Sequence, residues 1–185
     1  GERFCIELKE YGGPLYLPIE MLQNSAIRKL RKHSSIAFYL KAELGESSEM
    51  LIAIFKQKIS EIRYLYDFEY FAVMCETITD KMGAGQVPFR LNRGQRRLLS
   101  KIEEQRRANL PIRFRVLKSR QWGCSTFVQM YMKWIQIVHK TNWNSVVCAH
   151  VKDAAINVRA MYENSIEQMP AINGIKYTIR NFKQT

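Results

Sequence analysis

KSRQWGCST, which spans Lys118–Thr126, is the stretch of this 185-residue chain that decides its interpretation. The segment before it, Ile112–Leu117 (IRFRVL), alternates apolar and polar residues, which predicts a β-strand. The segment after it, Phe127–His139, carries apolar residues at helical spacing. A polar loop that leads from a strand into a helix is the usual place for a phosphate-binding loop.

The loop departs at two positions from the common phosphate-binding pattern GxxxxGK[ST]. Gly123 and Ser125 match its second glycine and its hydroxyl residue, whereas Lys118 stands at the first glycine and Cys124 at the lysine. Gly123 allows the backbone to approach a phosphate, and Ser125 offers a hydroxyl to Mg²⁺. Lys118 and Arg120 add positive charge. The alternative is a polar loop in which a Ser or Thr caps the next helix.

This loop resembles the variant ATP-binding loop of phage terminase large subunits, the motors that package DNA into capsids. The shared forms are K-S-x-R-x-x-G-x-S and S-R-Q-x-G-x-[ST], and in some members the lysine stands at the loop start, as Lys118 does. The resemblance implies ATP and Mg²⁺ as cofactors, Ser125 as the Mg²⁺ contact through the nucleotide, and Arg120 as a charge stabiliser. The nucleotide-binding residues that it implies in the loop are Lys118, Ser119, Arg120, Gln121, Trp122, Gly123, Cys124, Ser125 and Thr126.

A second motif, Pro88–Gln95 (PFRLNRGQ), supports the resemblance. It is similar to the terminase adenine motif, in which F-x-L is followed by a Gln four residues after the Leu, so Gln95 is the candidate contact for adenine. A Gln amide suits this role because it donates and accepts hydrogen bonds together. The alternative for Gln95 is a solvated helix residue. Weaker similarities extend the resemblance to about residues 66–170, at Tyr66–Phe71 and Val146–Ala155.

A packaging motor also needs an apolar strand that ends in Asp-Glu, to hold Mg²⁺ and to polarise the attacking water. After Lys118 the only carboxylate residues are Asp153, Glu163 and Glu167, and none follows an apolar strand. A cluster of carboxylates for a two-metal nuclease is also missing from the sequence. We therefore expect the chain to be an N-terminal fragment of a larger ATPase and endonuclease. The fragment by itself is expected not to hydrolyse ATP. The sequence assigns no catalytic residues.

The apolar spacing predicts two regions joined at residues 81–88. In the first, residues 1–17 are expected to form a strand pair or an ordered arm around Gly12-Gly13, and helices are expected over 19–30, 49–65 and onward to about Lys81. Residues 1–65 match no motif. The second region alternates helices and strands, as in a parallel sheet; they are expected at 93–109, 112–117, 127–139, 145–149, 152–169 and 175–179.

The fold class predicted from these patterns is α/β: an incomplete P-loop (RecA-like, ASCE-type) parallel sheet preceded by a mostly helical N-terminal segment. The expected domains are residues 1–80, helical, and residues 81–185, the N-terminal part of the ATPase domain.

The net charge of +12 is concentrated in the second region. Residues 1–80 hold 10 basic and 12 acidic side chains, and residues 81–185 hold 19 basic and 5 acidic ones. Such a balance predicts a polyanionic partner, here double-stranded DNA, with the small terminase subunit and the capsid portal implied by the resemblance. The candidate DNA-contacting helix carries Arg93, Arg96, Arg97, Lys101, Arg106 and Arg107, and a solvated face is its alternative.

Two other functions stay open at this stage. A helicase-like ATPase motor is disfavoured because helicases usually keep the loop lysine at the position of Cys124. A non-catalytic DNA-binding or assembly module would use the basic helix without a nucleotide.

The remaining features predict a location and exclude some sites. The longest apolar runs are much shorter than the roughly 20 residues of a membrane helix, which argues against a membrane partner. Scattered cysteines fit a reducing cytoplasm with mostly buried thiols, and the resemblance implies the host cytoplasm during phage assembly. The sequence lacks zinc-ligand spacing, a HExxH motif and a catalytic triad.

Overall fold

A computed structural model describes residues 2–79, 83, 85–119, 121–140, 143–149, 151–170 and 172. Its contacts divide the chain into two compact units. Unit 1 contains the described residues up to Phe71 together with Arg90–Trp122, and unit 2 contains Ala72–Phe89 and the described residues from Gly123 onward. These units interleave along the sequence, whereas the boundary at 81–88 divides it once; that boundary stays a prediction.

Unit 1 begins with an antiparallel hairpin of β1 (Arg3–Leu8) and β2 (Gly13–Pro18). The 3₁₀ turn η1 (Lys9–Tyr11) connects the strands, and Gly12 follows it with φ 66°, a left-handed conformation that glycine adopts without strain. Every second side chain of β1 is buried, which is the alternation of a strand with one covered face. Of the two alternatives for residues 1–17, the strand pair is therefore correct.

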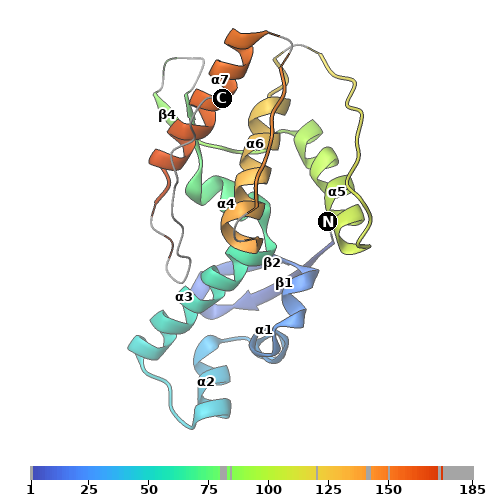
Figure 1. The fold of residues 1–185 in the computed structure, drawn as a ribbon. Helices are drawn as coiled ribbons and strands as arrows, with labels where there is room; N and C mark the ends of the chain where they lie inside the picture. Colours follow the sequence, from blue (N-terminus) through green and yellow to red (C-terminus); the bar gives the residue numbers. More distant parts are fainter. Residues whose placement is uncertain are drawn as a thin grey trace. The chain divides into compact units, whose positions relative to one another are not determined.

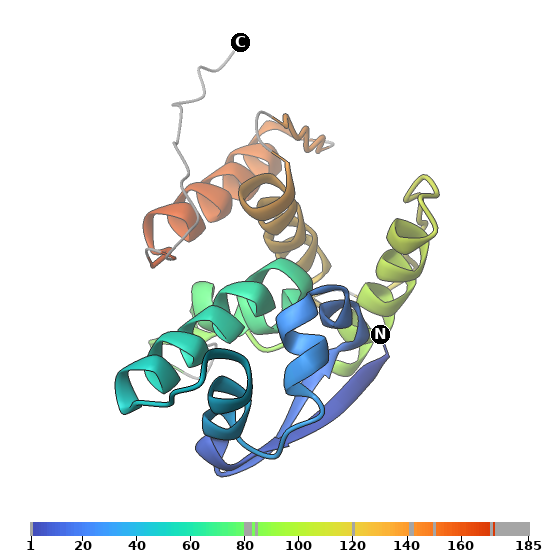
Figure 2. The same ribbon diagram turned by 90° about the horizontal axis from the view of Figure 1, so that it is seen from below.

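Helices cover the buried face of this hairpin, as Figure 2 shows for α1 to α3. The elements are the 3₁₀ helix η2 (Ile19–Gln23), α1 (Ser25–Leu30), α2 (Ile36–Leu44) and α3 (Glu49–Tyr66). Asn24, Ser35 and Ser48 cap the N-termini of the three α-helices through their side-chain oxygens, which satisfies N–H groups that the helices themselves leave open. The shared core includes Leu17, Met21, Ile27, Leu30, Ile36 and Ile59.

Asp67 joins the hairpin to the end of α3. Its carboxylate is 2% exposed and accepts two hydrogen bonds from Arg3, of 3.0 and 2.9 Å, and one of 3.1 Å from Nε of Arg63. Asp67 also precedes α4 (Phe68–Cys75), and it accepts a bond from the N–H of Tyr70. The same unit includes α5 (Arg93–Arg107), in which Arg96 forms an ion pair with Glu69.

Unit 2 is built mainly from two helices that pack together, α6 (Cys124–Trp134) and α7 (Lys152–Glu167), seen in orange and red in Figure 1. The helix α6 continues directly into one π-helical stretch, η3 (Ile135–His139). A small antiparallel hairpin, β3 (Thr77–Thr79) with β4 (Gln86–Pro88), belongs to the same unit. Phe127 and Trp134 are fully buried along α6.

A buried ion pair connects three segments of unit 2. Lys133 of α6 pairs with Glu76, which follows α4, and both side chains are 0% exposed. Nζ of Lys133 also donates to Oγ and to the carbonyl of Ser165 in α7, at 2.5 and 2.9 Å, while Oγ of Ser165 donates to Glu76 at 2.9 Å. Burial lowers the pKa of Lys133 and raises the pKa of Glu76, and their mutual attraction opposes both shifts.

The predicted fold class is wrong: the described part of the chain is mostly helical and contains no parallel P-loop sheet. The sheets among the described residues are two antiparallel pairs, β1–β2 and β3–β4. The expected strands 112–117 and 145–149 have no strand partner within the described part of the chain, and their apolar side chains are exposed, Leu117 at 102% and Val146 at 81%. Alternation of apolar and polar residues leads to a strand only where a second strand supplies hydrogen bonds and another layer covers the apolar face. The expected strand 175–179 lies outside the described residues.

Two further expectations for the first 90 residues need correction. The helix expected to reach Lys81 ends at Cys75, because Thr77–Thr79 pairs with Gln86–Pro88 in a hairpin. The thiols are not mostly buried: Cys75 is buried, Cys124 is half-buried, and Cys5 and Cys148 are exposed.

The carboxylate of Glu10 binds the start of α2, and from this contact we predict that the stability of the fold depends on pH. It accepts hydrogen bonds from Oγ of Ser35 at 2.6 Å and from the N–H groups of Ile36 and Ala37 at 2.9 and 3.0 Å. Burial raises the pKa of Glu10, but these hydrogen bonds outweigh burial and lower the pKa from 4.5 to about 2. Because the folded pKa is depressed, the stabilisation is complete above pH 4.5 and is lost as the pH falls towards 2.

We expect Glu10→Gln to lower the free energy of unfolding at neutral pH and to flatten its dependence on pH between 4.5 and 2. Urea denaturation at a series of pH values measures both effects. Glu46→Gln, at an exposed position between α2 and α3, serves as the control and should follow the wild type. A Glu10→Gln curve with the wild-type slope would contradict the assignment.

The buried pair predicts a strong asymmetry between single and double substitutions. Lys133→Met leaves the Glu76 carboxylate buried without a cation, which should lower the free energy of unfolding by about 3–5 kcal/mol. The double variant Lys133→Met/Glu76→Leu removes both charges and should recover most of that loss. Urea denaturation of both variants tests this, and additive losses in the double variant would show that the pair is not the main constraint.

Candidate nucleotide-binding site

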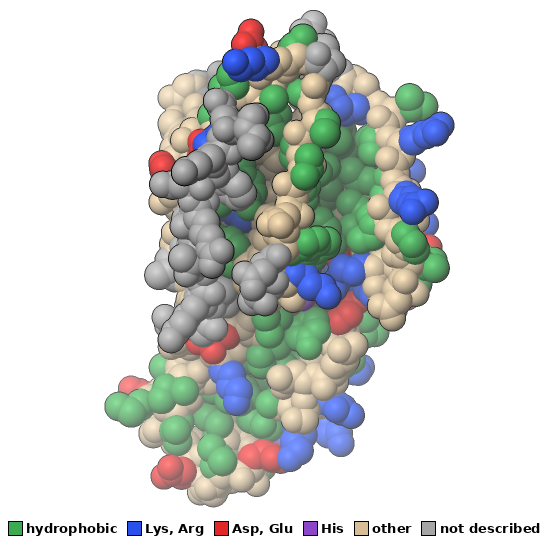
Figure 3. All heavy atoms as spheres, in the orientation of Figure 1, with side chains coloured by type: hydrophobic (Ala, Val, Ile, Leu, Met, Phe, Trp, Pro, Cys, Tyr) green, Lys and Arg blue, Asp and Glu red, His purple; other side chains and the backbone are tan. Residues whose placement is uncertain are grey.

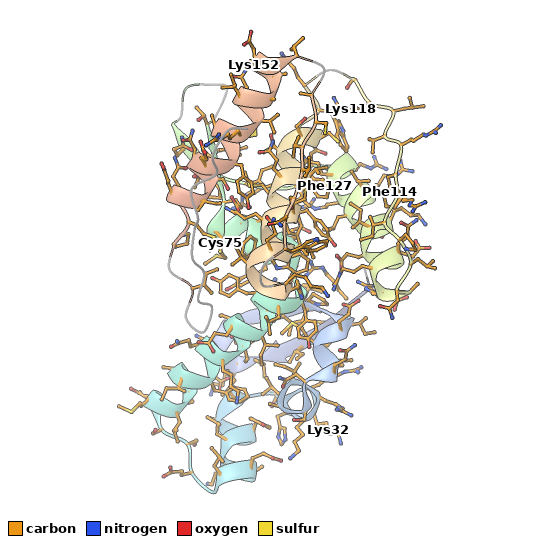
Figure 4. All side chains as sticks on the ribbon, viewed as in Figure 1. Lys32, Cys75, Phe114, Lys118, Phe127 and Lys152 are labelled. Carbon is orange, nitrogen blue, oxygen red and sulfur yellow. The ribbon has the colours of Figure 1, made fainter. Side chains whose placement is uncertain are left out.

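The candidate loop begins on an extended, exposed segment that follows α5. Figure 4 labels Phe114 and Lys118 on this segment. Both Lys118 and Ser119 are exposed, and Nζ of Lys118 donates a long hydrogen bond of 3.4 Å to the carbonyl of Ser119. The predicted charge stabiliser Arg120 lies outside the described residues.

The end of the loop turns sharply into α6. Gln121 has φ 59° and Gly123 has φ 78°, so both are left-handed, which costs free energy at Gln121 and little at the glycine. The helix starts at Cys124, and the N–H of Phe127 donates to the carbonyl of Gly123 at 3.0 Å. The last three residues of the candidate loop, Cys124–Thr126, are therefore also the first residues of α6.

The start of α6 differs from the side-chain-capped helices of unit 1. Among the described residues, no side chain makes a capping hydrogen bond at this end or at the start of α7, whereas Asn or Ser caps α1, α2, α3 and α5. The side chain of Ser125 is exposed in the first turn, and Cys124 and Thr126 are half-buried. Oγ1 of Thr126 lies 3.5 Å from the sulfur of Met161. First-turn N–H groups carry the positive end of the helix dipole and suit an anion.

Within unit 1, Trp122 brings the loop against the second predicted motif. Its carbonyl accepts a hydrogen bond of 3.3 Å from Nδ2 of Asn92, and its indole lies over Gly94. A Cβ atom at Gly94 would stand 2.4 Å from Cζ2 of Trp122, closer than two atoms can approach without moving. The sequence motifs PFRLNRGQ and KSRQW are thus neighbours, although Asn92 and Gly94 were not predicted as contact residues.

Gln95 is buried at the start of α5 and caps its own helix. Its Oε1 accepts from the N–H of Asn92 at 2.9 Å, while Oδ1 of Asn92 accepts from the N–H of Gln95 at 2.9 Å. This reciprocal arrangement is a capping box, and its signature N-x-x-Q was readable in the sequence. The solvated alternative for Gln95 is wrong, since the residue is 3% exposed, and its adenine contact stays a prediction.

The basic helix α5 is largely neutralised inside unit 1. Four of its six predicted phosphate contacts pair with carboxylates: Arg96 with Glu69, Lys101 with Glu104, Arg106 with Glu103, and Arg107 with Glu20. Arg93 and Arg97 have no ion pair within the described part of the chain. On the face in Figure 3, basic side chains stand singly or in small groups with acidic and apolar ones between them. These pairs weaken the case for α5 as a continuous DNA-contacting surface.

The acidic and thiol groups of unit 2 have different surroundings. Glu163 pairs with Arg159 at 2.7 Å, and Asp153 lies in the first turn of α7. Burial and the charge of Glu76 raise the pKa of Cys75 to about 12, so this thiol is not a nucleophile at neutral pH. No group of three His, Cys, Asp or Glu side chains suited to a metal ion is found among the described residues.

A search of the described helices for one that is long and apolar enough to cross a membrane finds none. Comparison with protein-family models, curated proteins and solved structures gives no match for this chain. The resemblance to terminases therefore rests on the motif residues alone.

The contact between Trp122 and Gly94 predicts a cost for the smallest possible side chain. Gly94→Ala should displace the indole and lower the free energy of unfolding by about 1–3 kcal/mol, although alanine is otherwise the better helix residue. In a Trp143→Phe background, stronger acrylamide quenching of tryptophan fluorescence should report the displaced Trp122. The double variant Gly94→Ala/Trp122→Ala should regain stability, and a fully tolerated Gly94→Ala would contradict the contact.

Proposed function

We propose that the chain binds the phosphates of ATP with the loop Lys118–Thr126 and is the ATP-binding part of a phage terminase large subunit. The observation that carries this proposal is the start of α6, where a left-handed Gly123 leads into a helix whose first turn has no side-chain cap among the described residues. An uncapped helix N-terminus with an exposed hydroxyl fits an anion better than the alternative of a Ser- or Thr-capped polar loop.

Each loop residue has a chemical part in this proposal. The N–H groups of Cys124, Ser125 and Thr126 donate to phosphate oxygens, because the first N–H groups of a helix lack partners within it. The exposed hydroxyl of Ser125 meets Mg²⁺, which the phosphates hold. Lys118 supplies positive charge from the exposed beginning of the loop, in place of the lysine that Cys124 replaces.

Trp122 supports the proposal from unit 1. Its contacts with Gly94 and Asn92 lie within unit 1 and join this one loop residue to the start of α5. Base recognition by Gln95 is the less supported part, because the capping box already uses its Oε1. The proposal therefore centres on phosphate and not on adenine.

The proposed activity of this chain is binding without hydrolysis. Glu163 forms an ion pair with Arg159, and no acidic residue after Lys118 follows an apolar strand. Hydrolysis, DNA cleavage and DNA translocation belong, in this proposal, to the longer parent protein. Double-stranded DNA, the small terminase subunit and the capsid portal are its proposed partners, in the host cytoplasm during phage assembly.

Binding of Mg²⁺-ATP by wild type, Lys118→Ala and Ser125→Ala tests the proposal. Charge-assisted hydrogen bonds contribute about 1.5–3 kcal/mol, so Lys118→Ala should weaken binding roughly ten- to hundredfold, and Ser125→Ala should weaken it less. Calorimetric titration measures the affinities, and ATP should raise the melting temperature of the wild type.

Lys152→Ala is the matched control, since it removes a lysine that is also exposed at the start of a helix, α7. Its affinity for ATP should equal that of the wild type. The proposal would be overturned in favour of a polar loop if ATP did not stabilise the wild-type protein. It would also be overturned if Lys118→Ala and Ser125→Ala both bound ATP with the affinity of the wild type.

A further inference from the structure

A cavity of about 200 Å³ lies in unit 2 between α6, α7 and the segment 143–147. Gln129 of α6 lines it and is 3% exposed. Neither Nε2 nor Oε1 of Gln129 has a hydrogen-bond partner among the described residues. A buried amide with both its donor and its acceptor unused is rare, because each unsatisfied polar atom costs free energy.

The neighbouring amide in the same cavity is satisfied by the protein. Nε2 of Gln136 donates to the carbonyl of Trp143 and to Oγ of Ser145, both at 2.8 Å, and its Oε1 accepts from the hydroxyl of Tyr162 at 2.7 Å. Burial raises the pKa of Tyr162, so its hydroxyl stays protonated and donates. These contacts hold the segment 143–147 against α6 and α7 without using Gln129.

Gln129 also differs from the buried polar residue one helical turn away. Lys133 is four residues further along α6 and therefore on the same face, where Glu76 and Ser165 satisfy it. On this face, Lys133 therefore has hydrogen-bond partners within the protein, whereas Gln129 lines a cavity without one among the described residues. A ligand with a hydrogen-bond donor and an acceptor side by side would satisfy both polar atoms of the Gln129 amide.

The remaining walls define the kind of ligand. Met132, Val147 and Val158 are apolar, and Trp143 adds an aromatic ring that is 53% exposed and open to stacking. Arg159 and Glu163 pair with each other at 2.7 Å, so the cavity offers no uncompensated charge. Its volume is below the roughly 300–1,000 Å³ of pockets for drug-sized ligands.

We propose that this cavity binds a small, neutral, planar molecule of the nucleobase kind, whose adjacent donor and acceptor pair with the Gln129 amide. The ring lies between the apolar walls and stacks on Trp143. This inference does not depend on the proposed phosphate loop, because all the residues that form the cavity belong to α6, α7 and the segment between them.

Free bases are the probes for this site. Uracil and adenine should bind the wild-type protein in saturation-transfer NMR and should change the fluorescence of Trp143. 1,3-Dimethyluracil keeps the size and the stacking face of uracil but lacks its N–H donors, so its binding should be at least tenfold weaker. No binding of either free base, or equal binding of the dimethyl derivative, would overturn the proposal.

Gln129→Met removes the amide while keeping a side chain of similar length. It should lose at least tenfold in affinity for uracil and melt at the wild-type temperature or higher, because an unpaired polar group leaves the interior. Gln57→Met, at an exposed position of α3 in unit 1, is the matched control and should bind uracil like the wild type.

A clear fall in the melting temperature of Gln129→Met would show that the chain or a bound water satisfies the amide, and would overturn the proposal. Trp143→Leu offers a second test that leaves the buried residues unchanged, since Trp143 is largely exposed. Its affinity for uracil should fall, and an unchanged affinity would contradict stacking and the proposed site.

Discussion

The buried ion pair of Lys133 and Glu76 is the constraint on which the arrangement of unit 2 depends. Removing two charges from water costs several kcal/mol for each ion, so the pair is tolerated only where both partners and Ser165 meet. That requirement fixes three segments together: the residue after α4, the middle of α6 and the end of α7. The buried apolar residues Phe127, Met130, Tyr131 and Trp134 lie at helical spacing on one side of α6, so apolar burial and the ion pair select the helix orientation together.

Fixing the rotation of α6 has consequences at both of the positions that we propose to bind ligands. Gln129 shares the buried face of Lys133, because the two are four residues apart on one helix. Ser125 comes one turn earlier still and is exposed in the first turn. Among the described residues, α6 therefore has a buried amide without a hydrogen-bond partner at the cavity and an exposed hydroxyl at a helix start without a side-chain cap.

Local signals in the sequence predicted some helices closely, missed α2, and predicted strands in the second half of the chain that did not form among the described residues. Apolar spacing located α3, α5 and α7 closely, whereas the helix expected over 127–139 begins at Cys124 and becomes π-helical from Ile135. Ser48 caps α3, as its position before Glu49 suggests. The strand pattern of residues 112–117 was misleading, because alternation describes one chain and not the partner that a strand needs. The ion pair could not be predicted, since nothing near Lys133 in sequence indicates that Glu76, 57 positions earlier, is its partner.

The candidate loop illustrates how a motif and its geometry carry different information. The motif KSRQWGCST predicted which residues would bind nucleotide, which stays a prediction, but it did not predict that Gln121 would be left-handed. A left-handed residue other than glycine costs about 1–3 kcal/mol, so surrounding contacts must maintain it. Within unit 1, the fit of Trp122 over Gly94 and its hydrogen bond from Asn92 hold the next residue in place. The contacts of Trp122 with the second motif therefore restrain the residue that follows Gln121.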